Sequence, residues 1–234
     1  STAGFASIIG ILILAFSDTT NAIIALSFFC ICILVLLMSI IWAIYSFVKR
    51  SNENNHLKVS VFTKFEALDK THSIFETYRV IQSKRIVLSE IDQNFKWSGS
   101  QLPKVSSRFQ KVKDVITNEH DYDKAILTFE KPLLYNETGV VHFRAETDDY
   151  DGKAKPYLDY KVESYINIIH YRVILKYKDD FQQPAKVLKR PIDCKTPTEY
   201  EEIGSITFDE RAKCYEYYLI NPAPGYFYRI QWEK

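Results

Sequence analysis

AIIALSFFCICILVLLMSIIWAIYSFV, from Ala22 to Val48, decides how this chain is organised, because it runs for 27 residues without a charged side chain. Lys49 and Arg50 end it. The hydrocarbon core of a bilayer is about 30 Å thick and needs about 20 apolar residues in a helix. Seventeen further uncharged residues, Ser1 to Ser17, precede this stretch. We therefore predict a two-helix transmembrane hairpin over residues 1–50.

A secretory signal peptide is the alternative interpretation of Ser1 to Ser17, and it would leave one true span. Signal peptides begin with basic residues, and none precedes this apolar segment. The chain starts with Ser rather than Met, so we expect further residues upstream that would lengthen a segment short for a span. The hairpin is the favoured interpretation.

The charges around the two apolar runs predict the orientation in the membrane. The turn between the runs, residues 17–21, contains no Lys or Arg and carries Thr20 and Asn21 as candidate helix caps. Basic residues follow the second run instead, at Lys49, Arg50, Lys58 and Lys64. By the positive-inside rule, we expect a multi-pass inner-membrane protein with a cytoplasmic C-terminal domain. Cys194 and Cys214, the two cysteines of that domain, should then be reduced.

Small side chains recur at regular steps in both apolar runs, and they allow helices to approach closely in lipid. Those predicted to pack are Ala3, Ser7 and Gly10 in the first run and Ala25, Cys32, Ser39, Ala43 and Ser46 in the second. Seven-residue steps place most of the second set on one seam. These seams could join the two helices of one hairpin. Alternatively, they could join helices of different subunits, and in that case the protein is a homo-oligomer. No charge within the runs marks an ion pathway.

The rest of the chain predicts an all-β domain over residues 73–234, after a linker and an ambiguous segment at 51–72. Ile169, Tyr171, Val173 and Leu175 alternate with polar residues, which is typical of a half-buried strand. Turn residues separate seven to nine such segments, so we expect an antiparallel β-sandwich or a small β-barrel. Leu57 to Leu68 fits either a strand or a helix.

The sequence offers no catalytic constellation. It has no activated-nucleophile motif and no phosphate-binding glycine loop, and its five histidines lack metal-ligand spacing. We expect a binding protein, neither an enzyme nor a metal or cofactor carrier. Asp148 to Gly152 is interpreted as a solvated hairpin tip. The basic pairs Lys84-Arg85 and Lys189-Arg190 are expected to face water, so we predict no nucleic-acid polymer as partner.

Phe227 and Arg229 are the candidate ligand-binding residues. They share one face of the last predicted strand, while Tyr226, Tyr228 and Trp232 share the other. An arginine beside an aromatic ring can hold a base by stacking and a phosphate by charge. The tyrosine face is expected to pack in the core instead.

Two N-terminal spans followed by one β-rich domain without a catalytic set resemble the two-transmembrane, β-strand-rich effectors of bacterial cyclic-oligonucleotide anti-phage systems. The resemblance rests on Ser1 to Arg50 and the strand pattern from Ser73 to Trp232. It implies a β-domain that binds a cyclic dinucleotide, and oligomerisation that disrupts the membrane.

The soluble part is larger than that family's minimal barrel, which favours a protein trigger such as a defence sensor. The alternative from another class is a constitutive membrane-anchored interaction module within a larger assembly.

Overall fold

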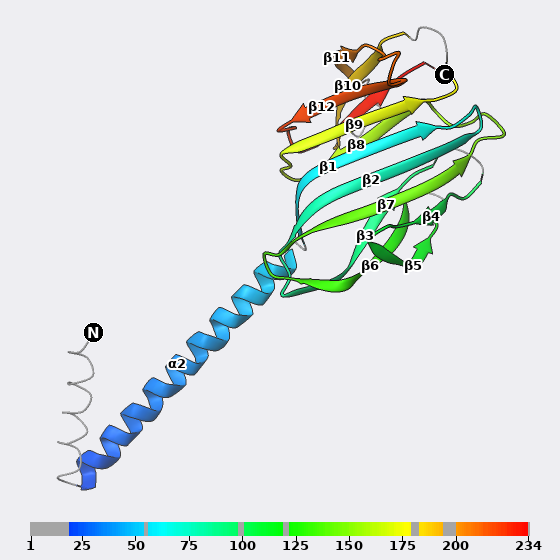
Figure 1. Ribbon diagram of the computed structural model, residues 1–234. Helices are drawn as coiled ribbons and strands as arrows, with labels where there is room; N and C mark the ends of the chain where they lie inside the picture. The colour runs from blue at the N-terminus through cyan, green and yellow to red at the C-terminus, as the bar shows by residue number, and fades with distance from the viewer. Residues whose placement is uncertain are drawn as a thin grey trace. The chain divides into compact units, whose positions relative to one another are not determined.

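The computed structural model describes residues 19–53, 56–97, 101–118, 122–178, 183–193 and 200–233 (Figure 1). The chain divides into two compact units, one ending at Glu53 and the other beginning at Asn54. The second unit therefore takes in most of residues 51–72, which the sequence assigns to a linker and an ambiguous segment.

Helix α2, Thr19–Glu53, forms the described part of the first unit. Its segment Leu26–Ser46 is long and apolar enough to cross a membrane, and none of it is buried. Thr20 and Asn21 lie inside this helix, so neither is the cap that the sequence predicts. The helix also continues past Lys49 and Arg50. The first span of the predicted hairpin, Ser1 to Ser17, lies outside the described residues.

A six-stranded sheet forms the larger layer of the β-unit, with the spatial order β12-β9-β1-β2-β7-β4. Its strands are β1 (His56–Ala67), β2 (His72–Ser83), β4 (Lys104–Ser106), β7 (Thr138–Asp148), β9 (Ile168–Leu175) and β12 (Cys214–Ile220).

Two smaller sheets complete the unit. One has the order β11-β10-β13-β8 and the other β3-β6-β5. The four-stranded sheet comprises β8 (Tyr157–Val162), β10 (Ala185–Pro191), β11 (Glu201–Ile206) and β13 (Tyr226–Gln231). The three-stranded sheet comprises β3 (Val87–Phe95), β5 (Gln110–Ile116) and β6 (Asp123–Leu134).

Both smaller sheets cover the same face of the six-stranded sheet, which we call its inner face. One hydrophobic core joins β1, β9 and β12 to the four-stranded sheet, and it includes Tyr171, Tyr215 and Trp232. The second core joins β2 and β7 to the three-stranded sheet around Phe143. Alternation along each strand sends the other set of side chains to the opposite, outer face.

The all-β prediction is confirmed, and the linear strand orders describe an open sandwich rather than a closed barrel. The expected antiparallel pairing holds for every described strand pair except β1 with β9, which run parallel. The strand that precedes β9 is β8, which lies in the other layer. The chain therefore crosses between layers before β9, and β9 begins beside the start of β1 and runs in the same direction.

The ambiguous segment Leu57 to Leu68 is strand β1 at the middle of the six-stranded sheet. Phe62 and Phe65 suggest helical spacing because both faces of this strand carry aromatic side chains. Phe65 packs against the core, whereas Phe62 lies on the outer face.

Candidate functional site: the outer face of the six-stranded sheet

Five rings form a continuous row across the outer face, one from each of the neighbouring strands β12, β9, β1, β2 and β7. We call Tyr218, His170, Phe62, Tyr78 and His142 the aromatic row. The strand register places each member opposite the next. Each lies on the outer face because its neighbours in sequence point into the core.

Ring contacts connect the whole aromatic row. Tyr218 stacks on His170 with centroids 4.1 Å apart and planes 12° apart, and His170 stacks on Phe62 at 4.6 Å. The row continues from Phe62 to Tyr78 at 6.0 Å and from Tyr78 to His142 at 4.5 Å. Tyr218 is 52% exposed, whereas His142 is 2% exposed, so the row is open at the β12 end and closed at the β7 end.

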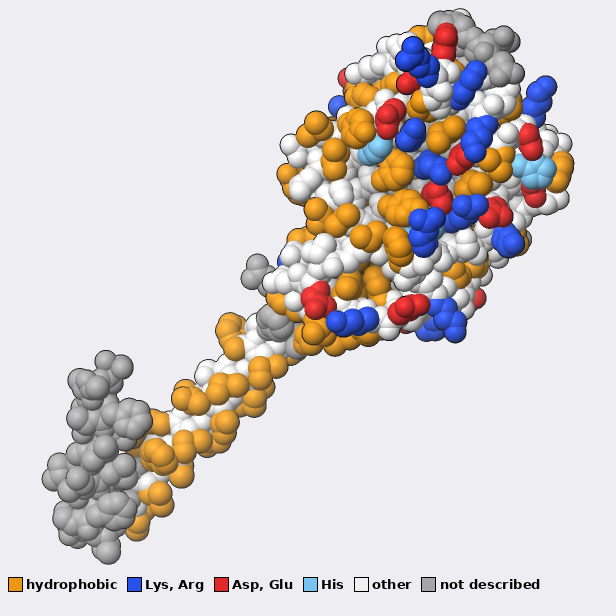
Figure 2. Space-filling model, in the orientation of Figure 1, with side chains coloured by type: hydrophobic (Ala, Val, Ile, Leu, Met, Phe, Trp, Pro, Cys, Tyr) orange, Lys and Arg blue, Asp and Glu red, His pale blue; other side chains and the backbone are white. Residues whose placement is uncertain are grey.

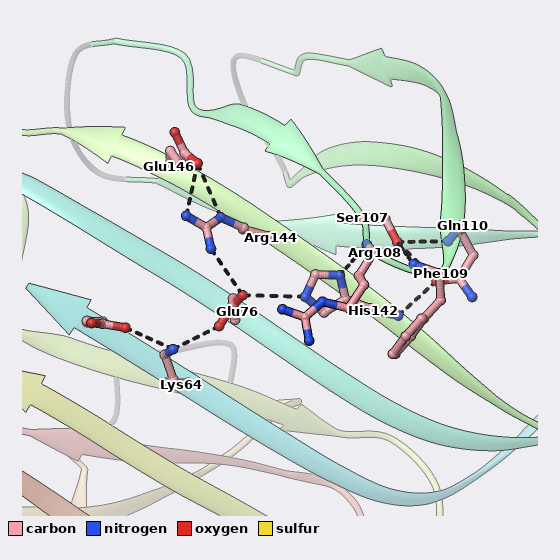
Figure 3. Close-up of polar contacts among 10 residues, drawn as sticks. Lys64, Glu76, Ser107, Arg108, Phe109, Gln110, His142, Arg144 and Glu146 are labelled. Atoms are coloured by element: carbon pink, nitrogen blue, oxygen red, sulfur yellow. Dashed lines mark hydrogen bonds and ion pairs between the residues drawn. The ribbon is translucent and has the colours of Figure 1, made fainter.

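The loop between β4 and β5 closes the row over His142. Phe109 contacts the rings of both Tyr78 and His142 and remains 46% exposed. The backbone N–H of Arg108 donates a 2.7 Å hydrogen bond to His142 Nδ1 (Figure 3). Gln110 accepts from the backbone N–H of His142 and donates to the carbonyl of Val140. These bonds fix the loop to the sheet.

His142 is held neutral. Its Nδ1 already accepts a backbone N–H, so the proton of the neutral ring lies on Nε2. Burial lowers the pKa of His142, and this outweighs the attraction of Glu76, whose carboxylate lies 3.6 Å from Nε2. The ring is therefore neutral and has a fixed tautomer at neutral pH.

A network of paired charges borders the aromatic row. Glu76 on β2 is 5% exposed and lies between Lys64 of β1, at 2.9 Å, and Arg144 of β7, at 3.4 Å (Figure 3). Burial raises the pKa of Glu76, but the hydrogen bond and charge of Lys64 and the charge of Arg144 outweigh it and leave the pKa lowered. Outer carboxylates extend the network, with Glu66 bound to Lys64 and Glu146 to Arg144.

An apolar row borders the other side of the aromatic row. At its centre, on β1, is Ser60. On one side of Ser60 the register aligns Ile168 of β9 and then Ile220 of β12. On the other side it aligns Val80 of β2 and then Val140 of β7. Ile220 and Val140 are 68% and 41% exposed. Figure 2 shows hydrophobic side chains beside acidic and basic ones on this face. Aromatic and aliphatic area rimmed by paired charges is the anatomy of a binding surface.

The predicted pair Phe227 and Arg229 lies elsewhere, on the face of the four-stranded sheet that points away from the core. Arg229 makes two hydrogen bonds to Asp159, at 2.6 and 2.8 Å. Its guanidinium also lies 3.7 Å from the ring centroid of Tyr157 and 4.0 Å from that of Tyr200. Asp159 therefore neutralises the charge of Arg229, and two tyrosine rings pack against its guanidinium group. The opposite face of β13 packs in the core as predicted, through Tyr228 and Trp232.

Some of the predicted helix-packing residues can be placed. Cys32, Ser39 and Ala43 are exposed on α2, and Ser46 is half-buried. The Ser39 hydroxyl donates to the carbonyl of Leu36 in its own helix, so this serine offers small size rather than an unused hydrogen-bond donor. Ala3, Ser7, Gly10, Cys194 and the side chain of Ala25 lie outside the described part of the chain.

The sequence interpretation missed the outer face. Its residues come from five segments between Phe62 and Tyr218, and only the strand register joins them. Alternation in β9 marks His170 as outward-facing but does not reveal its neighbours. In the acidic segment Asp148 to Gly152, the last three residues are exposed, as expected of a solvated tip. Asp149 differs, because it is 6% exposed and accepts the backbone N–H of Ala154. Among the described residues, no group of three or more His, Cys, Asp or Glu side chains is arranged to hold a metal ion.

Neither a protein-family model nor a curated protein sequence matches this chain. Solved structures with partial similarity include an M1 zinc metallopeptidase from Deinococcus radiodurans, at 12% identity and a TM-score of 0.40, covering 76% of this chain and 42% of the peptidase. The chain thus spans less than half of that enzyme. Another is baculovirus P35, at 10% identity and a TM-score of 0.39, covering 78% of this chain and 99% of P35.

Proposed function

We propose that this chain is a membrane-anchored effector of bacterial anti-phage defence, whose β-unit senses a partner and whose transmembrane helices assemble to disrupt the inner membrane. The observation that carries the proposal is the pairing of two features in one chain. One is the apolar, exposed segment Leu26–Ser46, which needs lipid or other helices to cover it. The other is a β-unit with its own cores and with an outer face on which the aromatic row and the apolar row lie beside paired charges.

The outer face favours a protein as the sensed partner. Nucleic acids are bound through Lys and Arg side chains that are available to phosphates. Here Lys64 and Arg144 are each already paired with two carboxylates. The aromatic row and the apolar row instead supply flat hydrophobic area with a polar rim, which suits a folded protein such as a defence sensor. A cyclic nucleotide is the second trigger that the resemblance suggests.

Clustering is the proposed link between sensing and membrane damage. A partner that prefers assembled β-units shifts the subunits toward the assembled state by its differential affinity. Small residues at Cys32, Ser39 and Ala43 would let α2 helices of different subunits approach closely. The proposal includes a membrane hairpin formed by α2 with residues 1–17. It also places the β-unit in the cytoplasm, because Lys49 and Arg50 follow the apolar segment.

The test is co-expression of the full chain with the product of each gene beside its own, with membrane potential read by a voltage-sensitive dye. We expect depolarisation with the cognate partner and none when residues 1–48 are deleted. Tyr218→Ser in the aromatic row should abolish the response, whereas the matched change Tyr165→Ser, also exposed but outside the row, should not. Depolarisation by the truncated chain would reject the effector mechanism.

A constitutive interaction module is the second candidate. The exposed aliphatic side chains of Ile220 and Val140 favour it, because permanent interfaces are more apolar than transient ones. In that case the partner co-purifies with the chain from uninfected cells, and its removal causes no change in toxicity. Neighbouring genes for envelope or transport machinery would support this candidate, and a nucleotidyltransferase or reverse transcriptase would support the effector.

A further inference from the structure

A buried arginine without an ion-pair partner in the described part of the chain lies inside the sandwich. Arg79 of β2 points to the inner face, opposite Val61 on one side and Val141 on the other. It is 6% exposed, and its Nε and Nη2 atoms have no hydrogen-bond partner among the described residues. A buried charge is costly unless it is paired, and a buried donor left unsatisfied adds to that cost.

A β-bulge brings two more basic side chains to the same region. The register between β1 and β2 shifts between Lys58 and Ser60. This shift places Lys58 opposite Ile81 and His56 opposite Ser83, so both share the inner face with Arg79. Both ring nitrogens of His56 are buried without a hydrogen-bond partner in the described structure.

The four-stranded sheet contributes a hydroxyl to this region. Tyr160 of β8 belongs to the side of that sheet which packs against the core. The ammonium of Lys58 lies 6.0 Å from the centroid of its ring. Burial raises the pKa of Tyr160 to about 12, against the effect of Arg79, so the hydroxyl keeps its proton and can donate it in a hydrogen bond.

The charges around this region are predominantly positive. The pKa of His56 is lowered to about 4, mainly by burial and to a smaller extent by the positive charges of Arg79, Lys58 and Arg85. Burial, followed by Arg79, also lowers the pKa of Lys58. The acidic neighbour of Lys58 is Glu163, which already forms a 2.7 Å ion pair with Lys161. The basic groups therefore outnumber the carboxylate that faces them.

We propose that Arg79, Lys58, His56 and Tyr160 form a binding site for a phosphate group, between the inner face of the six-stranded sheet and the four-stranded sheet. An oxyanion would neutralise Arg79 and accept its Nε–H and Nη2–H in the paired geometry that guanidinium groups offer to phosphates. Lys58 and Tyr160 would donate to the remaining oxygens. This site is separate from the outer face and independent of the proposed function.

Two sources can present this phosphate chemistry. One is a soluble phosphate ester, and the other is the head group of an anionic lipid. The second source is relevant because β1 begins three residues after α2 ends. A phosphate from either source would bind Arg79, so a substitution of Arg79 tests the chemistry that the two share. Comparing soluble phosphate esters with anionic lipid then distinguishes the two sources.

The test measures thermal unfolding of the full chain in maltoside detergent by near-ultraviolet circular dichroism, with ionic strength held constant by chloride. Inorganic phosphate and glycerol 3-phosphate are titrated separately, and nanodiscs with and without phosphatidylglycerol form the lipid arm. At saturation we expect the melting temperature of the wild-type protein to rise by about 5 °C. The source that gives the larger rise identifies the ligand class.

Arg79→Met should abolish this rise while leaving the melting temperature in chloride unchanged or higher, because it removes a buried unpaired charge. Arg211→Met changes an exposed arginine and is the matched control, which should keep the full rise. If Arg79→Met fails to fold, Lys58→Met replaces it and should reduce the rise. The proposal is overturned if no phosphate source raises the melting temperature, or if the Arg79 and Lys58 variants respond as the wild type does.

Discussion

Glu76 and Arg79 lie three residues apart on strand β2, on opposite faces of the same sheet, and both are almost completely buried. Glu76 is surrounded by opposite charge from Lys64 and Arg144. Arg79 leaves two donor atoms without a partner in the described structure. Glu76 therefore lies in a compensated network, whereas Arg79 carries a buried charge that we propose a phosphate group neutralises.

The largest effect should come from breaking the paired side of this comparison. Glu76→Ala leaves Lys64 and Arg144 without their shared carboxylate, so we expect the free energy of unfolding to fall by about 2–3 kcal/mol. Urea denaturation followed by tryptophan fluorescence measures it. Glu90→Ala, which breaks an exposed ion pair with Lys113, is the control and should change little. Equal losses in the two variants would show that burial of Glu76 does not strengthen its network.

A smaller effect, on pH dependence, should come from the unpaired side. His56 has a pKa of about 4 in the folded protein against an ordinary value of 6.5, so the unfolded chain binds its proton first as the pH falls. The contribution of His56 to the free energy of unfolding is therefore fully present above pH 6.5 and is lost as the pH falls from 6.5 to about 4. After allowance for partial exposure we expect a loss of about 1–2 kcal/mol.

His56→Gln removes the titrating group, and urea denaturation across this pH range should show a correspondingly flatter profile for the variant. His142 also titrates with a lowered pKa, but it is present in both proteins and cancels in the difference. Identical profiles for the wild type and the variant would mean that His56 is not shielded from solvent as described.

Tyr218→Ser should affect binding without affecting the fold. Its side chain is 52% exposed and lies at the open end of the aromatic row, so we expect a change in unfolding free energy within about 0.5 kcal/mol. Capture of the cognate partner by the purified full chain should fall at least tenfold if this ring contributes as an interface anchor. Unchanged capture would move the binding surface away from the aromatic row.

The smallest effect on the β-unit is expected from the helix. Ser39→Leu with Ser46→Leu removes two small residues from α2, and should reduce the oligomer size in detergent while leaving the melting temperature of the β-unit unchanged. Size-exclusion chromatography with light scattering measures the first quantity. An unchanged oligomer would place the seam within one subunit.

The sequence allows the elements to be predicted better than the surfaces. Alternation identifies β9 through Tyr171 and its inward neighbours, because a half-buried strand leaves that pattern in one segment. The aromatic row leaves no such pattern, since Phe62 meets His170 only through a parallel pairing of β1 with β9. A long-range register of this kind is set by the packing of the whole sandwich.

The inner site is hidden for a related reason. Lys58 reaches the inner face because a bulge shifts the β1 register, and simple alternation along the strand does not reveal where a bulge falls. Phe227 and Arg229 illustrate the opposite case. The sequence correctly places them on one face, but the bonds from Arg229 to Asp159 and its contact with Tyr200 depend on two other segments of the chain.

Forced clustering tests the central claim most directly, because it needs no knowledge of the natural trigger. A chemically inducible dimerisation domain is fused after Lys234 of the full chain and of a chain without residues 1–48, and membrane potential is followed in living cells after the inducer is added. The account predicts rapid depolarisation with the full chain and none with the truncated one. Cells that keep their membrane potential while the full chain is clustered, or that lose it with the truncated chain, would contradict it.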